Sequence, residues 1–300
     1  LEKHFDVALV GRHIKMFFKD KGTFFTSLIA PLILLVLFVL FLGNVYRDSF
    51  YSSVPADIVV PDKVIEGFVG GWLLSSLLAV SCVTVAFCAN MQIVQDKVTG
   101  AIGDFSVTPY KKSYLALSYY LATAAVTAAI CYVALGAGFI YLACVGWYIS
   151  AGDALFIVLD VFLLSLFGTA LSSVICFFIK TQGGSTAVSV VVSSVYGFIS
   201  GAYMPISQFA NGIQIFVSLL PGTYGTGLFR NHFMGGVLAE IGNYFPPEVV
   251  DGIRTSFDCN MFFFGHKVEV GTMFLILGVT VAVLIGVYVL LHLLKKRAKN

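Results

Sequence analysis

The side chains that could carry out acid–base, nucleophilic or metal chemistry are few in this chain and lie far apart. Its five histidines are isolated from one another, at His4, His13, His232, His266 and His292. The patterns His-Glu-x-x-His, Gly-x-Ser-x-Gly and Cys-x-x-Cys are absent, and so is the ATP-binding loop Gly-x4-Gly-Lys-Ser/Thr. We therefore predict no catalytic residues and no enzyme, and we interpret each histidine as an interfacial polar group.

The cysteines give no sign of a metal or redox site. Five of the six lie in or beside apolar stretches, and no pair has the spacing of metal ligands. The six are Cys82, Cys88, Cys131, Cys144, Cys176 and Cys259. We interpret them as small apolar residues. No metal and no cofactor is expected in this chain.

One ionisable residue, Asp160, lies well inside an apolar stretch. A carboxylate at the centre of a bilayer costs about 3 kcal/mol unless it faces a partner or water. Two interpretations stay open: a hydrated or hydrogen-bonded structural group, or a group that binds a proton or substrate. A secondary transporter would need several such charges, and an intramembrane enzyme would need clustered polar groups, so both remain minor alternatives.

The elements that position these residues follow from composition. Of 300 residues, 58% are apolar and only 11% are charged, against roughly 45–50% and about 25% in soluble domains. This excludes a soluble enzyme, a disordered chain and a nucleic-acid-binding protein. We predict an all-α membrane protein with one permease domain over residues 1–300. Since a span needs about 20 apolar residues, we expect six spans: Thr23–Gly43, Gly67–Asn90, Leu115 to a loop near Gly146–Gly152, Ala154–Ile179, Thr186–Met204 and Val270–Leu294.

Charge distribution sets the orientation. If the termini, the 91–114 segment and the 180–185 turn face the cytoplasm, that side holds 13 of the 18 basic residues and five acids. Its charge is then +8, against −6 for the rest of the chain. By the positive-inside rule, we predict a multi-pass protein of the cell (cytoplasmic) membrane with both termini in the cytoplasm.

Two segments predict amphipathic helices on the cytoplasmic side. Residues 5–21 carry apolar side chains at i, i+4, i+7 and i+8 from Val10, typical of an interfacial helix; a plain extension of the first span is the alternative. Residues 91–112 predict a short helix over 96–105 with Val98, Ile102 and Phe105 on one face. An apolar face in the cytosol usually binds a partner protein, although a simple surface loop stays possible.

Residues 205–267 form a predicted extracellular region. Gly212–Leu220 is apolar but too short to cross, so we expect a re-entrant or interfacial helix that Pro221 ends. We read Thr223–Met234 as a second short amphipathic piece, followed by a soluble stretch to His266.

Three segments in order resemble the integral membrane subunits, or permeases, of ATP-binding-cassette exporters of the ABC-2 class. They are VGRHIKMFFKDKGTFFTSLIAPLILLVLF, DKVTGAIGDFSVTPYKK and GFISGAYMPISQFANGIQIFVSLLPGTYGTGLFRNHF. Val98 and Gly103 stand where the family often has glutamates, and the 235–267 insertion is longer than in minimal members.

The resemblance implies an obligate complex with two ATP-binding-cassette ATPase subunits, which bind ATP and Mg, and a second permease copy or paralogue, within membrane lipid. No nucleic acid is expected. The helix at 96–105 would be the coupling helix that docks on the ATPase. The implied coupling residues are Asp96, Lys97, Thr99, Gly100, Ile102, Phe105, Thr108 and Pro109.

The resemblance also implies a substrate pathway at a dimer seam, lined by Phe68, Trp72, Ser75, Ala79, Ser189, Val192, Tyr196 and Ile199. The implied outer re-entrant motif is Pro205, Pro221, Gly222, Tyr224 and Arg230. An aromatic and aliphatic lining suits export of a lipophilic or amphipathic, drug-like substrate. Export of lipid-linked polysaccharide or teichoic acid, or of a peptide or bacteriocin, is the alternative.

Overall fold

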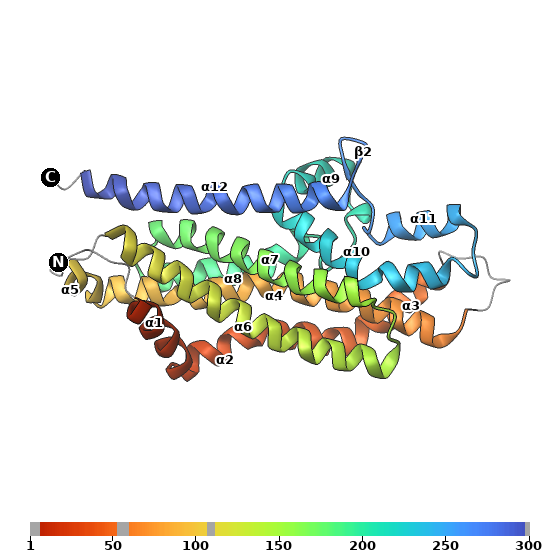
Figure 1. Ribbon diagram of the computed structural model, residues 1–300, viewed down its shortest axis with the longest axis horizontal. Helices are drawn as coiled ribbons and strands as arrows, with labels where there is room; N and C mark the ends of the chain where they lie inside the picture. Colours follow the sequence, from red (N-terminus) through yellow and green to blue (C-terminus); the bar gives the residue numbers. More distant parts are fainter. Residues whose placement is uncertain (1–6, 53–59, 107–111, 298–300) are drawn as a thin grey trace.

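The chain forms an elongated bundle of helices (Figure 1). The structure is a computed structural model that describes residues 7–52, 60–106 and 112–297. Helix α5 and the last turns of α12 lie at one end of the bundle and α11 lies at the other (Figure 1), and we call these the α5 end and the α11 end. In chain order the elements are α1 (Val7–Lys19), α2 (Lys21–Leu37), the π-helical turn η1 (Phe38–Leu42), α3 (Gly43–Ser52), α4 (Asp62–Val98), α5 (Ala101–Ser106), α6 (Lys112–Val145), α7 (Ala151–Phe178), α8 (Gln182–Ile199), the 3-10 turn η2 (Ile206–Gln208), α9 (Asn211–Ser218), α10 (Pro221–Ile241), α11 (Pro247–Ser256), β1 (Met261–Phe263), β2 (His266–Val268) and α12 (Val270–Arg297).

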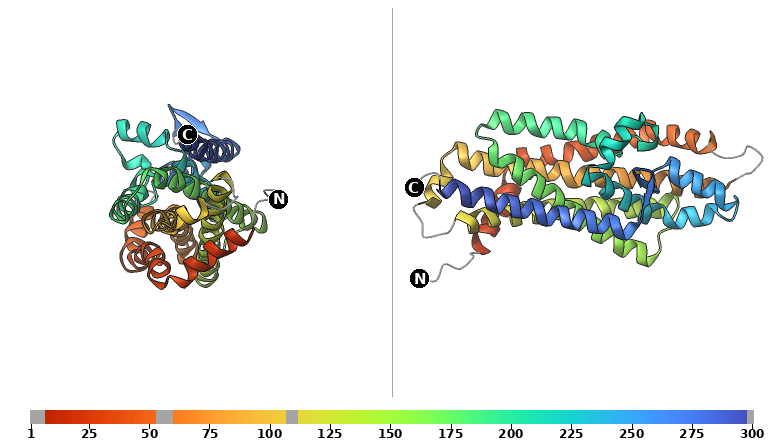
Figure 2. Two further views of the ribbon diagram at one scale, coloured as in Figure 1. Left: turned by 90° about the vertical axis from the view of Figure 1, so that its left-hand side faces the viewer. Right: turned by 90° about the horizontal axis from the view of Figure 1, so that it is seen from above.

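Helix α4 is the centre of the bundle. It has 37 residues, about 55 Å at 1.5 Å per residue, and its most apolar stretch is completely buried. Helices α2, α6, α7, α8 and α10 pack around it (Figure 2). Because the helix is enclosed on all sides, its apolar residues form the core of the protein and do not face lipid.

Polar side chains cap the first turn of several helices. Asp20 accepts a hydrogen bond from the Thr23 amide at the start of α2, and Ser150 accepts one from the Asp153 amide at the start of α7. Thr181 does the same for α8 through the Gly184 amide. Helices α1 and α2 meet at Asp20 with a 75° bend. That the helix predicted over residues 5–21 lies in the membrane interface stays a prediction.

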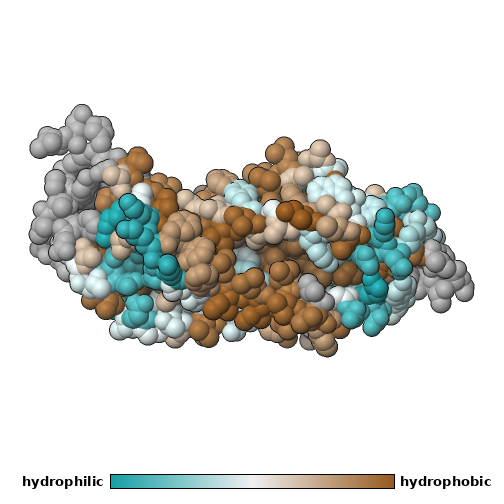
Figure 3. Space-filling model, turned by 90° about the horizontal axis from the view of Figure 1, so that it is seen from below, coloured by the Kyte–Doolittle hydropathy of each residue, from teal (hydrophilic) through white to brown (hydrophobic). Residues whose placement is uncertain are grey.

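The helices are long and apolar enough to make an all-α membrane protein, as predicted. In the described residues four helices could cross a membrane, or five if the bent pair α1 and α2 is one span. Figure 3 shows a broad hydrophobic band between hydrophilic groups near the two ends. The predicted count of six is not confirmed. Helix α8, the expected fifth span, has only 18 residues and includes several serines and glycines, which lower its hydropathy.

The region between α8 and α12 differs from the expected succession of short pieces. Helix α9 is short, as predicted, but α10 is one continuous 21-residue helix. It packs against α4, α7 and α12. Its glycines allow this close packing: a Cβ at Gly225 would lie 2.5 Å from the Leu164 side chain. The antiparallel hairpin of β1 and β2, with Met261 opposite Val268, closes the region before α12.

Candidate functional site

The predicted coupling segment lies at the α5 end, where α4 stops and α5 begins. Helix α4 continues through Val98, so the expected helix over 96–105 is divided into the last turn of α4 and the separate helix α5. Gly100 makes the turn between them with a φ of +84°. Only glycine adopts this conformation without steric cost. Asp96 and Lys97 are therefore fixed on the central helix, and α5 projects from it.

Asp96 joins α4 to α1 and α6. Its carboxylate is almost fully buried, accepts a short hydrogen bond from the Tyr119 hydroxyl of α6, and lies 3.6 Å from the Arg12 guanidinium of α1. The His13 ring stacks on the Tyr119 ring at a centroid distance of 3.9 Å. Burial, with a smaller contribution from Arg12, lowers the pKa of His13 to about 4. His13 is thus held neutral inside the contact and is not the interfacial group that we expected.

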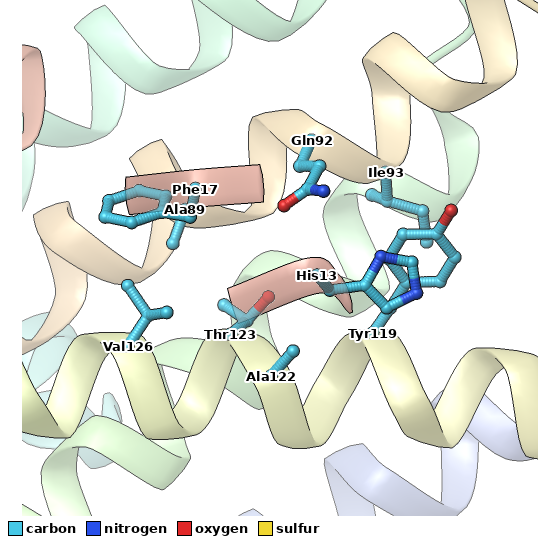
Figure 4. A pocket seen from close by; sticks show the side chains of 9 residues that line it. All are labelled: His13, Phe17, Ala89, Gln92, Ile93, Tyr119, Ala122, Thr123 and Val126. Carbon is cyan, nitrogen blue, oxygen red and sulfur yellow. The ribbon is translucent and has the colours of Figure 1, made fainter. Parts of the chain in front are cut away.

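A cavity of about 10 Å³ lies beside this contact, between α1, α4 and α6. Figure 4 shows the His13 and Tyr119 rings side by side at one edge of it and Phe17 at the other. The volume is close to that of one water molecule. The site therefore holds helix α1 in place and is too small for an organic ligand.

Lys97 joins α4 to the end of α7. Its ammonium group donates to the carbonyl oxygens of Cys176 at 2.7 Å, Phe177 at 3.1 Å and Ile179 at 3.3 Å. These carbonyls belong to the last turn of a helix, where backbone acceptors lack intrahelical partners and the helix dipole favours a cation. Two consecutive residues thus connect the end of α4 to three other helices.

The apolar face predicted for the coupling helix is only partly exposed. Val98 is 52% exposed, whereas Ile102 packs against Ile93, Val94 and Tyr119. The contact anchors α5 to the bundle, which sequence alone could not show. Thr99 closes α4 by donating its hydroxyl to the Gln95 carbonyl. The side chain of Phe105, and Thr108 and Pro109 as a whole, lie outside the described residues.

The predicted pathway residues are divided between the core and a pocket. Phe68, Trp72, Ser75 and Ala79 of α4 are fully buried within the chain, since neighbouring helices cover every side of α4. On α8, Ser189 is buried and Val192 is half-buried. Tyr196 and Ile199 line an apolar pocket of about 230 Å³ between α7, α8, the start of α10 and α12. The α4 residues do not line this pocket, and their role in a pathway stays a prediction.

The residues of the predicted outer motif build the connection between α8 and α10. Pro205 precedes η2, and Pro221 is the first residue of α10, where its missing amide proton is tolerated. A Cβ at Gly222 would lie 2.6 Å from the Tyr196 hydroxyl. The Tyr224 hydroxyl donates to the Ser218 carbonyl at 2.7 Å.

Arg230 is the centre of this connection and is completely buried. Its guanidinium lies 2.7 Å from the Asp258 carboxylate, donates to the Gly201 carbonyl, and lies 4.9 Å from the centre of the Trp72 ring. Asp258 in turn accepts hydrogen bonds from the backbone amides at the start of η2. Asp258 could not be identified from the sequence, because nothing in the pattern of a loop carboxylate indicates a partner 28 residues away.

Asp160 also has a partner that the sequence did not indicate. Its carboxylate lies 2.6 Å from Nδ1 of His232, on α10. His232 is buried, so our interpretation of it as an interfacial group was wrong. Among the described residues, no three His, Cys, Asp or Glu side chains are grouped so that they could hold a metal ion.

Comparison with known proteins agrees with this architecture. The family model of the ABC-2 type transporter matches residues 7–234, about three quarters of the chain. The match includes α1, the α4–α5 junction and α10 as far as Met234, and it ends before α11 and the hairpin. A comparison with curated proteins gives no match. Because this family match covers most of the chain, the chain belongs to the ABC-2 type transporter family, as a multi-pass membrane permease of an ABC transporter that works with an ATPase subunit.

Proposed function

We propose that this chain is the membrane-spanning subunit of an ATP-driven exporter, and that it moves a lipophilic or amphipathic, drug-like substrate out of the cell. The α5 end faces the cytoplasm and binds the ATPase subunits. The chain itself is not an enzyme and needs no cofactor, because ATP and Mg are bound by the partner. Two ATPase copies and a second permease, identical or related, complete the complex in the cell membrane.

The observation that carries this proposal is the junction of α4 and α5. Here Asp96 and Lys97 connect the central helix to α1, α6 and α7, while Val98 remains exposed beside the turn. A push on α5 is thus transmitted to four helices at once.

The pocket beside Tyr196 and Ile199 supports the substrate class. All of its accessible lining is apolar, and it lies between helices of the bundle. A hydrocarbon or aromatic group gains free energy on entering such a space, about 25 cal/mol per Å² buried, whereas an unpaired charge would lose free energy there.

The test is reconstitution of the permease with its ABC ATPase subunit in liposomes. We expect a stable complex that moves a fluorescent lipophilic dye only when ATP is present, and Val98→Asp should lower transport while the chain still folds. Ile102→Asp is a less specific variant, because Ile102 also packs inside the bundle. ATP-driven movement of a lipid-linked oligosaccharide or a peptide, with no movement of the dye, would replace the substrate class by the alternative. Dye transport by the permease without any ATPase would contradict the proposal.

A further inference from the structure

Asp160 and His232 form an ionisable pair inside the helical bundle. Asp160 lies nine residues after the start of α7, about 14 Å along the helix axis, and His232 lies in the second half of α10. The Asp160 Oδ2 and His232 Nδ1 atoms are 2.6 Å apart, and the two side chains are only 1% and 9% exposed. Ionisable side chains placed this deep in a membrane protein mark functional sites by default.

The pair retains an unused acceptor. Asp160 Oδ1 is buried and has no hydrogen-bond partner among the described residues. A lone carboxylate charge in such surroundings is costly, and so is a lone imidazolium. The favourable state is the one with no net charge, in which the carboxyl and the imidazole share one proton. The packed pair therefore holds one proton.

Aromatic rings from two helices cover the imidazole. The Phe156 ring, one turn before Asp160 on α7, stacks on it at 5.1 Å with an interplanar angle of 13°. Phe274 of α12 lies 5.9 Å away. These contacts keep water from the pair only as long as α7, α10 and α12 remain together.

Several other titratable or charged groups on α7, α10 and the helices packed against them are engaged elsewhere. Tyr132 of α6 donates its hydroxyl to the Val158 carbonyl, and Cys82 of α4 contacts the Val161 carbonyl. On α10 itself, Arg230 is paired with Asp258. On α7, Asp153 is bonded to Ser150 in the first turn. On α12, Tyr288 and His292 lie at least 14 residues beyond Phe274 and contact each other.

We propose that Asp160 and His232 form a proton-binding site that links the packing of α7 against α10 to pH. The pair keeps its proton while the two helices are packed. When they separate, the imidazole meets water, where it titrates near pH 6.5, and the proton passes from the ring nitrogen to water. A carboxylate and a neutral imidazole are left behind. This goes beyond ATP-driven export, which requires no proton.

The linkage fixes the direction of the effect. Above about pH 6.5 the separated form releases one proton, so the ratio of separated to packed molecules rises tenfold for each pH unit. Below about pH 6.5 the separated form keeps the proton, and the ratio stops changing. Separation is therefore favoured by alkaline pH and suppressed by acidic pH.

The test uses the full chain alone in lipid nanodiscs and so does not depend on the ATPase. Hydrogen exchange of the α10 amides is measured by mass spectrometry from pH 5.5 to 8.5 and corrected for the intrinsic pH dependence of exchange. We expect opening in the wild type to be constant up to about pH 6.5 and then to increase about tenfold per unit. Asp160→Asn should abolish the increase, because the packed pair then holds no proton to release, whereas Asp153→Asn, the same change two turns earlier on α7, should leave it intact. His232→Gln should remove the constant region below about pH 6.5, because the packed carboxyl of Asp160 keeps a proton by itself and the separated carboxylate releases it over the whole range.

Each outcome is decisive. If the increase persists in Asp160→Asn, or the constant region below about pH 6.5 persists in His232→Gln, the proposal is wrong. Should Asp160→Asn fail to fold, His232→Gln decides alone through the region below about pH 6.5, because glutamine still donates a hydrogen bond to Asp160 but does not titrate in this range.

Discussion

Removal of the Lys97 ammonium group should loosen the last turn of α7. In Lys97→Met the apolar stem is kept, while the three contacts with the carbonyls of Cys176, Phe177 and Ile179 are lost. Those carbonyls can then accept hydrogen bonds only from water at the end of the helix. The expected result is local fraying of α7 at the α5 end, with the rest of the bundle unchanged.

The size of the effect follows from the contacts. Hydrogen bonds to a charged group contribute about 1.5–3 kcal/mol net, and the helix dipole adds about 0.3–1 kcal/mol for a cation at a helix C-terminus. Lys97 is half-exposed, so its contribution lies toward the lower value. A loss of about 1.5 kcal/mol raises the population of the frayed turn roughly tenfold.

Hydrogen exchange of the amides of residues 174–178 measures this population directly. We expect exchange about tenfold faster in Lys97→Met than in the wild type. Lys63→Met is the matched control, since Lys63 lies on the same helix, is exposed, and is at the opposite end. Equal exchange in the wild type and Lys97→Met would refute the proposed role of Lys97 as a cap of α7. In the assembled transporter, the same variant should hydrolyse ATP but transport less substrate per ATP.

Three further predictions concern single residues. Burial, with an adjacent arginine as the smaller cause, lowers the pKa of His13 to about 4. Because His13 is neutral in the folded protein, thermal stability should fall as the pH decreases from about 6.5 to about 4. His13→Phe should reduce this loss of stability. Arg230→Met should leave the Asp258 carboxylate buried without its partner and lower the free energy of unfolding by about 3–5 kcal/mol, measured as a lower unfolding temperature in detergent. The double variant Arg230→Met/Asp258→Asn should lose less stability than the sum of the losses in the two single variants. Gly100→Ala should strain a backbone at φ +84° by about 1–2 kcal/mol and reduce transport per ATP, while Gly103→Ala, in open space, should not.

These predictions fail in distinct ways. An identical acid sensitivity in the wild type and His13→Phe would mean that other groups determine the pH response of the α1 contact. Additive effects of the Arg230 and Asp258 substitutions would mean that the two groups do not stabilise each other. Equal transport by the two glycine variants would show that the turn at Gly100 is not needed for coupling.

The long apolar helices could be predicted because the bilayer imposes their length. The prediction Ala154–Ile179 differs from α7 by only a few residues at each end, and Val270–Leu294 matches α12 to within three residues. The bend before α2 was also visible in the sequence, since Asp20 and the neighbouring lysines interrupt an otherwise apolar stretch.

Helix α10 could not be predicted because its glycines favour a turn when only local sequence is considered. In the structure they serve packing between helices: a Cβ at Gly225 would clash with Leu164, and one at Gly236 would clash with the Tyr148 carbonyl. Such small residues let helix backbones approach closely. The information lies in the partner helices and not in the segment itself.

The polar pairs were missed for a related reason. Asp160 and His232 are 72 residues apart, so only tertiary structure brings them together. The resemblance to ABC-2 permeases implied that Asp96 and Lys97 are coupling residues, and that role stays a prediction; the contacts of these two residues come from α1, α6 and α7. A pattern along the chain indicates which residues matter, whereas their partners depend on the fold.

The most direct test of the central claim is a photo-crosslink from the α4–α5 junction. A photoreactive amino acid placed at Val98, which is 52% exposed, is activated by light in membranes that contain the permease and the ATPase. The control position is Phe262, on β1 toward the α11 side, which is 42% exposed. We expect a crosslink to the ATPase from Val98 and none from Phe262. A crosslink from Phe262, or none from Val98 in a complex that still hydrolyses ATP, would contradict it.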